Sequence, residues 1–168
     1  MPLRSDRFIL RASTAVQALL AFALACAPYA AFAQQVVLGT TRNLDFGRFV
    51  AGSGGTIVLS PSGLRSRTGG VVLLNSPNAG QAAFSASRST LDPATSATAV
   101  IISVPANGAT RLSSGANSMA VGDFVTPDAQ LAVGNGGAAL AVGATLIVAP
   151  NQAPGNYSGS FSIIVNHQ

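Results

Sequence analysis

The stretch that decides the fold stands at the end of the chain and reads Gly155-Asn-Tyr-Ser-Gly-Ser-Phe-Ser-Ile-Ile-Val-Asn-His-Gln168. Its large side chains stand on alternate positions: Tyr157, Phe161, Ile163, Val165 and His167. Side chains on a β-strand change direction every two residues, so these side chains share one face. Serines and asparagines stand between them, with Gly159 as the small member of the series and Ile164 as an apolar exception on the other face. The pattern predicts a half-buried strand that reaches the chain terminus.

The residues that precede this stretch show the same kind of organisation. No long helical period appears after Ala33, and short apolar runs alternate with turn residues at roughly ten-residue spacing. We expect strands over residues 35–41, 43–50, 56–60, 71–74, 82–87, 99–104, 119–126, 130–133 and 139–148. Residues 65–70 and 89–96 are polar and predict loops. The chain is therefore expected to fold as an all-β sandwich or barrel.

Two local irregularities can also be predicted. Apolar residues change faces between Val121 and Phe124, which indicates a β-bulge near Gly122. Residues 134–137 read Gly-Asn-Gly-Gly, a sequence that tolerates positive φ and predicts a hairpin turn.

The first 33 residues have the pattern of a cleavable export signal. Three arginines lead, an apolar run covers residues 15–27, and Ala31-Phe-Ala33 is an A-x-A cleavage site, so the mature chain is expected to begin at Gln34. The apolar run is too short for a comfortable membrane span, and no second run follows. Lipidation at Cys26 is the less favoured alternative, because Ala23 stands where a lipid-anchor signal has a large aliphatic residue.

Charge and cysteine content narrow the function classes. The mature part holds six arginines and four aspartates, a net charge of +2, and neither Lys nor Glu occurs anywhere. The arginines are scattered, whereas nucleic-acid binders gather basic residues on one face, so nucleic acid is not an expected partner. The single cysteine, Cys26, would be removed with the signal peptide, so neither a disulfide nor a thiolate metal site is expected in the mature chain.

The sequence offers few residues that could form a catalytic, metal or cofactor site, and we do not expect this protein to be an enzyme. A serine nucleophile needs a base, and the only histidine is His167, beside the terminus. Asp123 and Asp128 lack the spacing of a calcium loop, so no metal is predicted. Gly134-x-Gly136-x-x-Ala139 reads as a hairpin between strands rather than a dinucleotide fingerprint, so no cofactor is predicted. Tyr157 is expected to pack in the sandwich rather than stack on a sugar.

Four stretches together resemble a known family. They are Leu44-Asp-Phe-Gly47, Gly55-Thr-Ile-Val58 followed by Pro61-Ser-Gly63, Val142-Gly-Ala-Thr-Leu146, and Gly155-Asn-Tyr-Ser-Gly-Ser-Phe161. In this order they resemble DUF4402, a family of secreted bacterial domains of unknown function. That family is similar to spore-coat U-like proteins and to chaperone-usher fimbrial subunits.

The resemblance implies an immunoglobulin-like, pilin-like sandwich of about eight short strands that lacks one strand. In such subunits a periplasmic chaperone lends the strand, an outer-membrane usher guides assembly, and the N-terminal extension of the next subunit then takes its place. A glycine stands fourteen residues from the C-terminus, which Gly155 fits. An aromatic residue is usually penultimate, and His167 departs from that pattern.

On this basis the chain divides into a signal peptide (1–33), an N-terminal extension (34–43) and a sandwich domain (44–168). The expected assembly strand presents Gly155, Tyr157, Phe161, Ile163, Val165 and His167. The extension offers only Val36 and Leu38 on its better face as a donor strand.

Two functions follow from how the terminal strand is covered. An exposed apolar sheet edge promotes aggregation, so the N-terminal segment or another chain must cover it. The first hypothesis is an exported structural subunit of a fimbria-like or coat-like bacterial surface assembly, which polymerises with itself or related subunits by strand complementation. The alternative is a self-complete, monomeric surface or periplasmic module that binds glycans.

Overall fold

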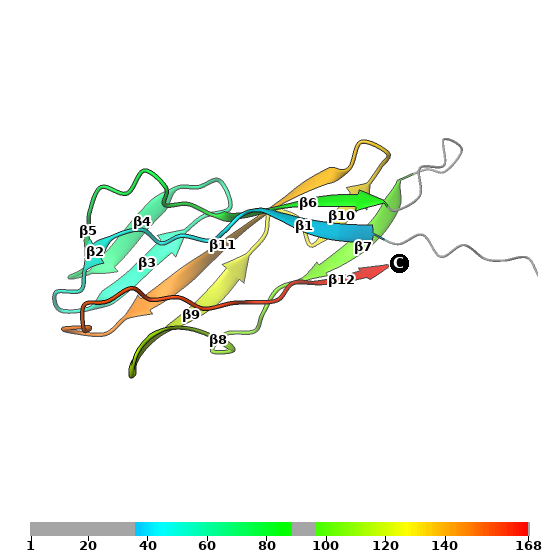
Figure 1. The fold of residues 1–168 in the computed structure, drawn as a ribbon. Helices are drawn as coiled ribbons and strands as arrows, with labels where there is room; N and C mark the ends of the chain where they lie inside the picture. Colours follow the sequence, from blue (N-terminus) through cyan, green and yellow to red (C-terminus); the bar gives the residue numbers. More distant parts are fainter. Residues whose placement is uncertain (1–35, 89–96, 168) are drawn as a thin grey trace, which may run out of the picture. The chain divides into compact units, whose positions relative to one another are not determined.

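The computed structural model describes residues 36–88 and 97–167, all within the compact unit that begins at Gln34 (Figure 1). The described residues form strands and no helix, which confirms the predicted all-β sandwich. The predicted signal peptide, Cys26, the cleavage site at Ala31 and Ala33, and the 89–96 loop lie outside the described residues. In chain order the strands are β1 (Val36–Arg42), β2 (Phe49–Val50), β3 (Gly55–Leu59), β4 (Arg65–Gly69), β5 (Val72–Leu73), β6 (Ala82–Arg88), β7 (Thr98–Ser103), β8 (Thr110–Ser114), β9 (Asn117–Val125), β10 (Gln130–Val133), β11 (Ala138–Val148) and β12 (Ile164–His167).

The long strand β11 organises the largest sheet. Its first half pairs with β6, and its second half pairs with β3 and β9, always antiparallel. β1, β4 and β8 then add to β6, β3 and β9, respectively. Because β11 is apolar over most of its length, both of its halves contribute to the core.

Two smaller sheets complete the sandwich. One has the order β10-β7-β12, and the other pairs β2 with β5. In β7, Val100 and Ile102 are buried whereas Ile101 is 36% exposed, so this apolar run has one solvent face. The continuous apolar run 99–104 predicts a buried strand, and that prediction is wrong for the face that carries Ile101.

The predicted bulge near Gly122 is present. The pairing of β9 with β11 shifts between Gly143 and Thr145, and Asp123 adopts a φ of 46°. Because the bulge inserts an extra residue, Phe124 turns back to the core instead of facing the opposite side. The predicted hairpin is also present: the N–H of Gly137 donates to the carbonyl of Gly134 (3.1 Å), and Gly137 alone of the turn residues has a positive φ.

Two strands were not expected from the sequence. Residues 65–69 form β4 instead of a loop, because they pair with β3 at the edge of a sheet where polar side chains can face water. The hydroxyls of Thr56 and Thr68 lie 2.7 Å apart across this pair. β8 is also polar and pairs with β9, and Gly115 in the intervening turn has a φ of 59°.

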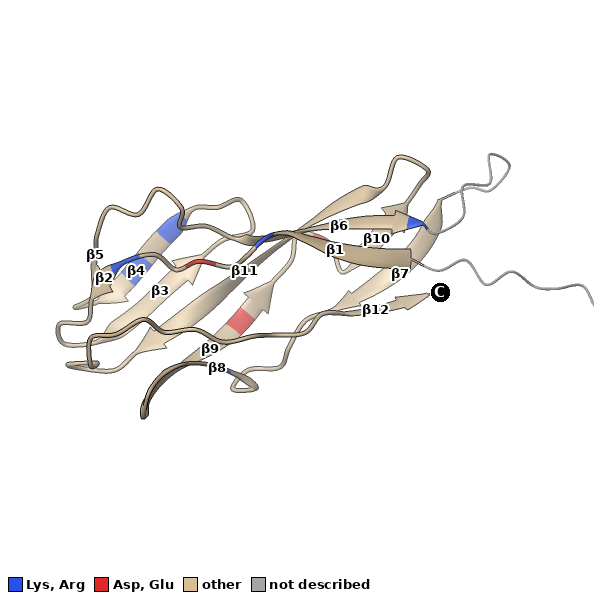
Figure 2. Ribbon diagram, in the orientation of Figure 1, with Lys and Arg blue, Asp and Glu red and all other residues tan. Residues whose placement is uncertain are grey.

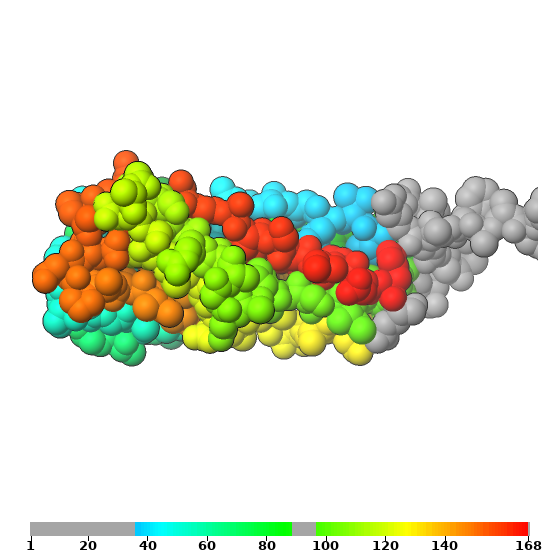
Figure 3. Space-filling model, turned by 90° about the horizontal axis from the view of Figure 1, so that it is seen from below, coloured from blue at the N-terminus to red at the C-terminus, as the bar shows by residue number. Residues whose placement is uncertain are grey.

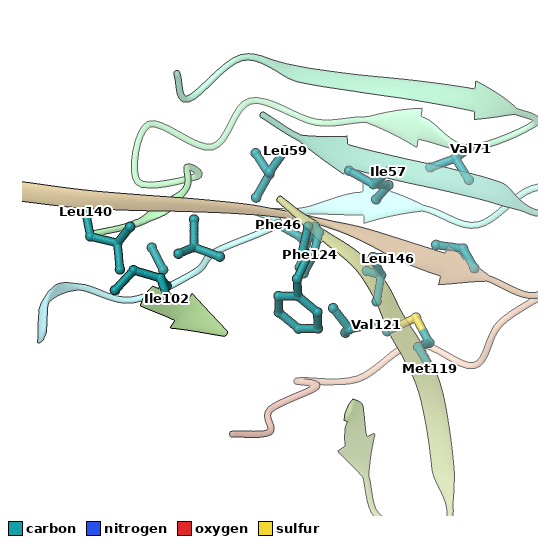
Figure 4. Packing of buried hydrophobic residues seen from close by; sticks show 14 of the residues in the cluster. Phe46, Ile57, Leu59, Val71, Ile102, Met119, Val121, Phe124, Leu140 and Leu146 are labelled. Atoms are coloured by element: carbon teal, nitrogen blue, oxygen red, sulfur yellow. The ribbon is translucent and has the colours of Figure 1, made fainter. Parts of the chain in front are cut away.

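The core is built from residues of nearly every strand (Figure 4). The largest side chains that are almost fully buried are Ile57, Leu59, Val71, Val100, Val121, Val133, Val142 and Leu146. Burial of each such side chain stabilises the fold by about 1.5–3 kcal/mol. The half-buried residues packed against the core include Phe84, Tyr157, Phe161, Ile163 and Val165.

Two neighbouring residues of β11 allow a matched test of the core. Leu146 is 1% exposed and Ile147 is 52% exposed. We expect Leu146→Ala to lower the free energy of unfolding by about 2–5 kcal/mol, because it removes buried methyl groups and leaves a cavity. Ile147→Ala should cost about 1 kcal/mol or less. Urea denaturation followed by circular dichroism measures both, and equal losses would contradict the assigned burial.

Candidate functional site

The N-terminal residues of the described chain form one long wall, which we name the N-terminal wall (residues 36–50). β1 pairs with β6, the backbone of Asp45 exchanges two hydrogen bonds with Gly80 (2.9 and 2.8 Å), and β2 pairs with β5. Residues 36–50 thus run antiparallel to residues 72–88. The predicted strand over 43–50 is reduced to this bridge and the short β2.

The Leu-Asp-Phe-Gly stretch, residues 44–47, forms a local turn. The carboxylate of Asp45 accepts a hydrogen bond from the N–H of Gly47 (2.7 Å), and Gly47 has a φ of 71°. A side chain at Gly47 would also collide with Ser76. The turn directs Phe46 into the core, where it is 5% exposed, and leaves Leu44 half-buried.

Hydrogen bonds from two arginines connect the loop after β5 (residues 74–81) to the N-terminal wall. The guanidinium of Arg42 donates to the carbonyls of Asn78 (3.1 Å) and Ala79 (3.0 Å). Arg65 donates to the carbonyls of Leu74 (3.0 Å) and Arg48 (2.7 Å). Burial lowers the pKa of the Arg65 guanidinium, and the nearby Asp45 carboxylate partly opposes that shift. These arginines therefore act on the protein's own backbone.

The C-terminal residues form the second wall, which we name the C-terminal wall (residues 155–167). Ser158 exchanges two backbone hydrogen bonds with Ser113 of β8 (2.8 and 3.1 Å), and β12 then pairs with β7. The predicted terminal strand is thus regular only over Ile164–His167. Its alternation is confirmed, because Phe161, Ile163 and Val165 are half-buried whereas Ile164 is 59% exposed.

Small residues and one aromatic residue let the C-terminal wall pack closely against β8 and the core. A side chain at Gly155 would collide with Ser114, and one at Gly159 would collide with the carbonyl of Arg111. The ring of Phe161 packs against Phe124 (centroids 5.0 Å apart) and edge-on to Phe84 (6.4 Å). The glycines therefore let the wall approach β8 closely, and the aromatic ring anchors it to the core.

Tyr157 and His167 have structural surroundings that bear on the sequence-based expectations. The half-buried Tyr157 donates its hydroxyl hydrogen to the carbonyl of Ala153 (2.7 Å) and accepts one from the amide of Gln152 (2.9 Å). Tyr157 thus packs in the sandwich as expected, with its hydroxyl engaged by its own chain. His167 is exposed on β12, opposite Val100.

A groove of about 1440 Å³ lies between the two walls. It is lined by residues 40–52 on one side and by residues 151–161 on the other. Its floor is formed by the half-buried Phe84 and Leu112 and by the buried Ala82, Thr110, Met119, Val121 and Leu146. Figure 3 shows the two walls side by side, in cyan and red, and Figure 1 shows that they run in opposite directions. No strand pairing joins β1 to β12.

Residues on both sides of the groove have unpaired backbone groups. Asp45 and Ser158 bond to Gly80 and Ser113. The residues beside them that line the groove are Leu44, Phe46, Tyr157 and Gly159. Their backbone N–H and C=O groups have no backbone partner among the residues that the structure describes.

Charge distinguishes the C-terminal side of the groove from the outer edge of the large sheet. β4 carries Arg65 and Arg67, which discourage pairing with another strand (Figure 2). The groove is lined by Arg42, Asp45 and Arg48 on its N-terminal side and by neither an Asp nor an Arg among residues 151–161. Its C-terminal side thus lacks the charged residues that would keep a further strand away.

The other residues singled out in the sequence lie apart from the groove's edges. The Asp123 carboxylate accepts a hydrogen bond from the side-chain amide of Asn107 (2.8 Å), and the backbone N–H of Asp123 donates to the side-chain oxygen of Asn107 (2.6 Å). Within residues 36–88 and 97–167, no group of three or more metal-ligating side chains comes together. In the same residues, no helix is long and apolar enough to span a membrane.

The groove's edges could be predicted only in part. The alternation in residues 155–168 identified the C-terminal wall, but the roles of Leu44 and Phe46 as an unpaired edge were missed. The Asp-x-Gly spacing of the turn was the available signal, since Asp45 caps the N–H two residues on. Val36 and Leu38, expected as a donor strand, lie half-buried in β1 against their own core, and their donor role stays a prediction.

The fold defines a class: an all-β sandwich, here with a groove between its N-terminal and C-terminal walls. Residues 37–167 match the family model described as "Domain of unknown function (DUF4402)", so the chain belongs to that family. No curated protein and no solved structure matches the chain.

Gly159 tests how the C-terminal wall is seated. We expect Gly159→Ala to lower the free energy of unfolding by about 1–3 kcal/mol, because the added methyl group meets the carbonyl of Arg111. Gly136→Ala at the hairpin tip is the matched control, because nothing lies within 4 Å of its added methyl group. Thermal unfolding of both variants makes the comparison, and an unchanged Gly159 variant would show that the wall stands away from β8.

Proposed function

We propose that this protein is an exported, non-enzymatic structural subunit of a fimbria-like or coat-like bacterial surface assembly. It joins its neighbours by strand complementation, in which an extended strand of a neighbouring subunit fills the groove between the N-terminal and C-terminal walls. The observation that carries this proposal is the pair of unpaired backbone edges at Leu44–Phe46 and Tyr157–Gly159.

A strand is the occupant that best fits both chemical features of the groove. Its backbone would bond to both edges, and each such hydrogen bond stabilises the complex by roughly 0.5–1.5 kcal/mol. Its alternate side chains would contact Phe84 and Leu112, the half-buried residues of the floor. Burial of each large apolar side chain adds about 1.5–3 kcal/mol. Backbone pairing would thus provide the affinity for the incoming strand, and contacts with the floor would fix the register in which that strand binds.

The cellular route belongs to the same proposal. The signal pattern of residues 1–33 supports export to the periplasm and then to the cell surface. A groove with two open edges favours aggregation, so a periplasmic chaperone that covers it before assembly is a reasonable partner. An outer-membrane usher is the corresponding assembly partner that the family resemblance supports.

A tethered strand tests complementation directly. A copy of residues 34–43, joined after Gln168 through a short glycine-asparagine turn, should enter the groove antiparallel to β12. We expect the melting temperature to rise by on the order of 10 °C, because burial and backbone pairing add a few kcal/mol to stability. Differential scanning calorimetry of the mature protein with and without the added strand measures the shift.

The control carries aspartate at the two positions of the added copy that correspond to Val36 and Leu38. It should give little or no rise, because an aspartate over the apolar floor would be buried without a partner. If neither added strand changes the melting temperature, the groove is not a strand site, and the self-complete binding module becomes the better hypothesis.

A further inference from the structure

β1 is a structural part of the groove that it borders. It pairs with β6 from Val36 opposite Arg88 to Arg42 opposite Ala83. Val36 and Leu38 pack on the core of the same chain. Thr40 and Arg42 line the groove itself. The N-terminal wall is continuous from β1 to β2, so removal of β1 would leave the groove with an incomplete side.

This placement limits what a copy of the chain can give to another copy. A copy that lent β1 to a neighbour would uncover the edge of β6 and lose part of its own strand-binding groove. A strand from another copy could then pair with the uncovered edge of β6, which would be exchange of β1 and would leave the groove between the two walls unfilled. With cleavage after Ala33, as the sequence predicts, only Gln34 and Gln35 precede β1. Two extended residues reach about 7 Å, which is too short to fill a groove bordered by residues 40–50.

We propose that the strand that fills the groove comes from a different protein, while β1 stays paired with β6. This inference rests on the proposed function and names the partner of the same groove. The partner contributes an extended segment with apolar side chains on alternate positions. The side chains that face the floor are uncharged, because the half-buried Phe84 and Leu112 offer a buried charge no partner.

A reversible crosslink separates this arrangement from exchange of β1. Val37 and Ser87 are exposed and stand directly opposite each other in the β1–β6 pair. Opposed residues of antiparallel strands lie at a separation that a disulfide can bridge. The mature chain holds no other cysteine, so Val37→Cys with Ser87→Cys would form a single crosslink, the β1–β6 lock, that holds β1 on β6. Thr56→Cys with Thr68→Cys, an opposed pair in β3 and β4, is the matched control.

The first measurement is the mass of the mature protein alone, by light scattering over a range of concentrations. We expect a monomer in the oxidised and the reduced states of both variants. Oligomers that disappear when the β1–β6 lock is oxidised and return on its reduction would show exchange of β1 and overturn the proposal. Oligomers that persist in the oxidised state would overturn it too, because another segment of the same chain would then be the donor.

The second measurement uses a defined strand as the probe. Ten residues of alternating valine and threonine, joined after Gln168 through the short turn, stand in for the partner's segment. We expect the same rise in melting temperature with the β1–β6 lock oxidised and reduced, on the order of 10 °C. A rise that the oxidised lock abolishes would overturn the proposal, because the strand would then need the place of β1. If no added strand raises the melting temperature in any variant, the proposed function itself fails, a result distinct from those above.

Discussion

The structure depends on one constraint, which is that backbone hydrogen-bonding groups near a core need partners. The two ends of the described chain meet this constraint on one side only. Asp45 and Ser158 bond to Gly80 and Ser113, and the groove-lining residues beside them have no backbone partner among the residues that the structure describes. Every other feature of the groove supports this arrangement: Gly47 and Gly159 permit close approach, and Phe46 and Phe161 hold the walls on the core.

The remainder of the fold explains why the groove stays open between two well-anchored walls. β11 joins the two halves of the sandwich, because it pairs with β6 first and with β3 and β9 later. The bulge at Asp123 keeps Phe124 directed inward, where it contacts Phe161 of the C-terminal wall. The walls are thus attached to different neighbours, β6 on one side and β8 with β7 on the other.

Sequence patterns predicted what depends on local side-chain alternation and turn chemistry. The exposed Ile164 between the half-buried Ile163 and Val165, the Gly122 bulge and the Gly134–Gly137 turn all follow from such patterns. The strand β4 escaped prediction because an edge strand can be polar throughout and then resembles a loop. The N-terminal side of the groove escaped prediction because it depends on which residues are not paired, and pairing between residues distant in sequence leaves little trace in local composition.

The arginine contacts of the N-terminal wall have a consequence for the environment in which the protein can work. Arg42 and Arg65 hold backbone carbonyls, and arginine side chains stay charged over the range in which histidine and carboxylates titrate. Carbonyl acceptors do not titrate at all. The attachment of the loop to the wall is therefore insensitive to pH over that range, unlike an attachment through histidine or carboxylate pairs.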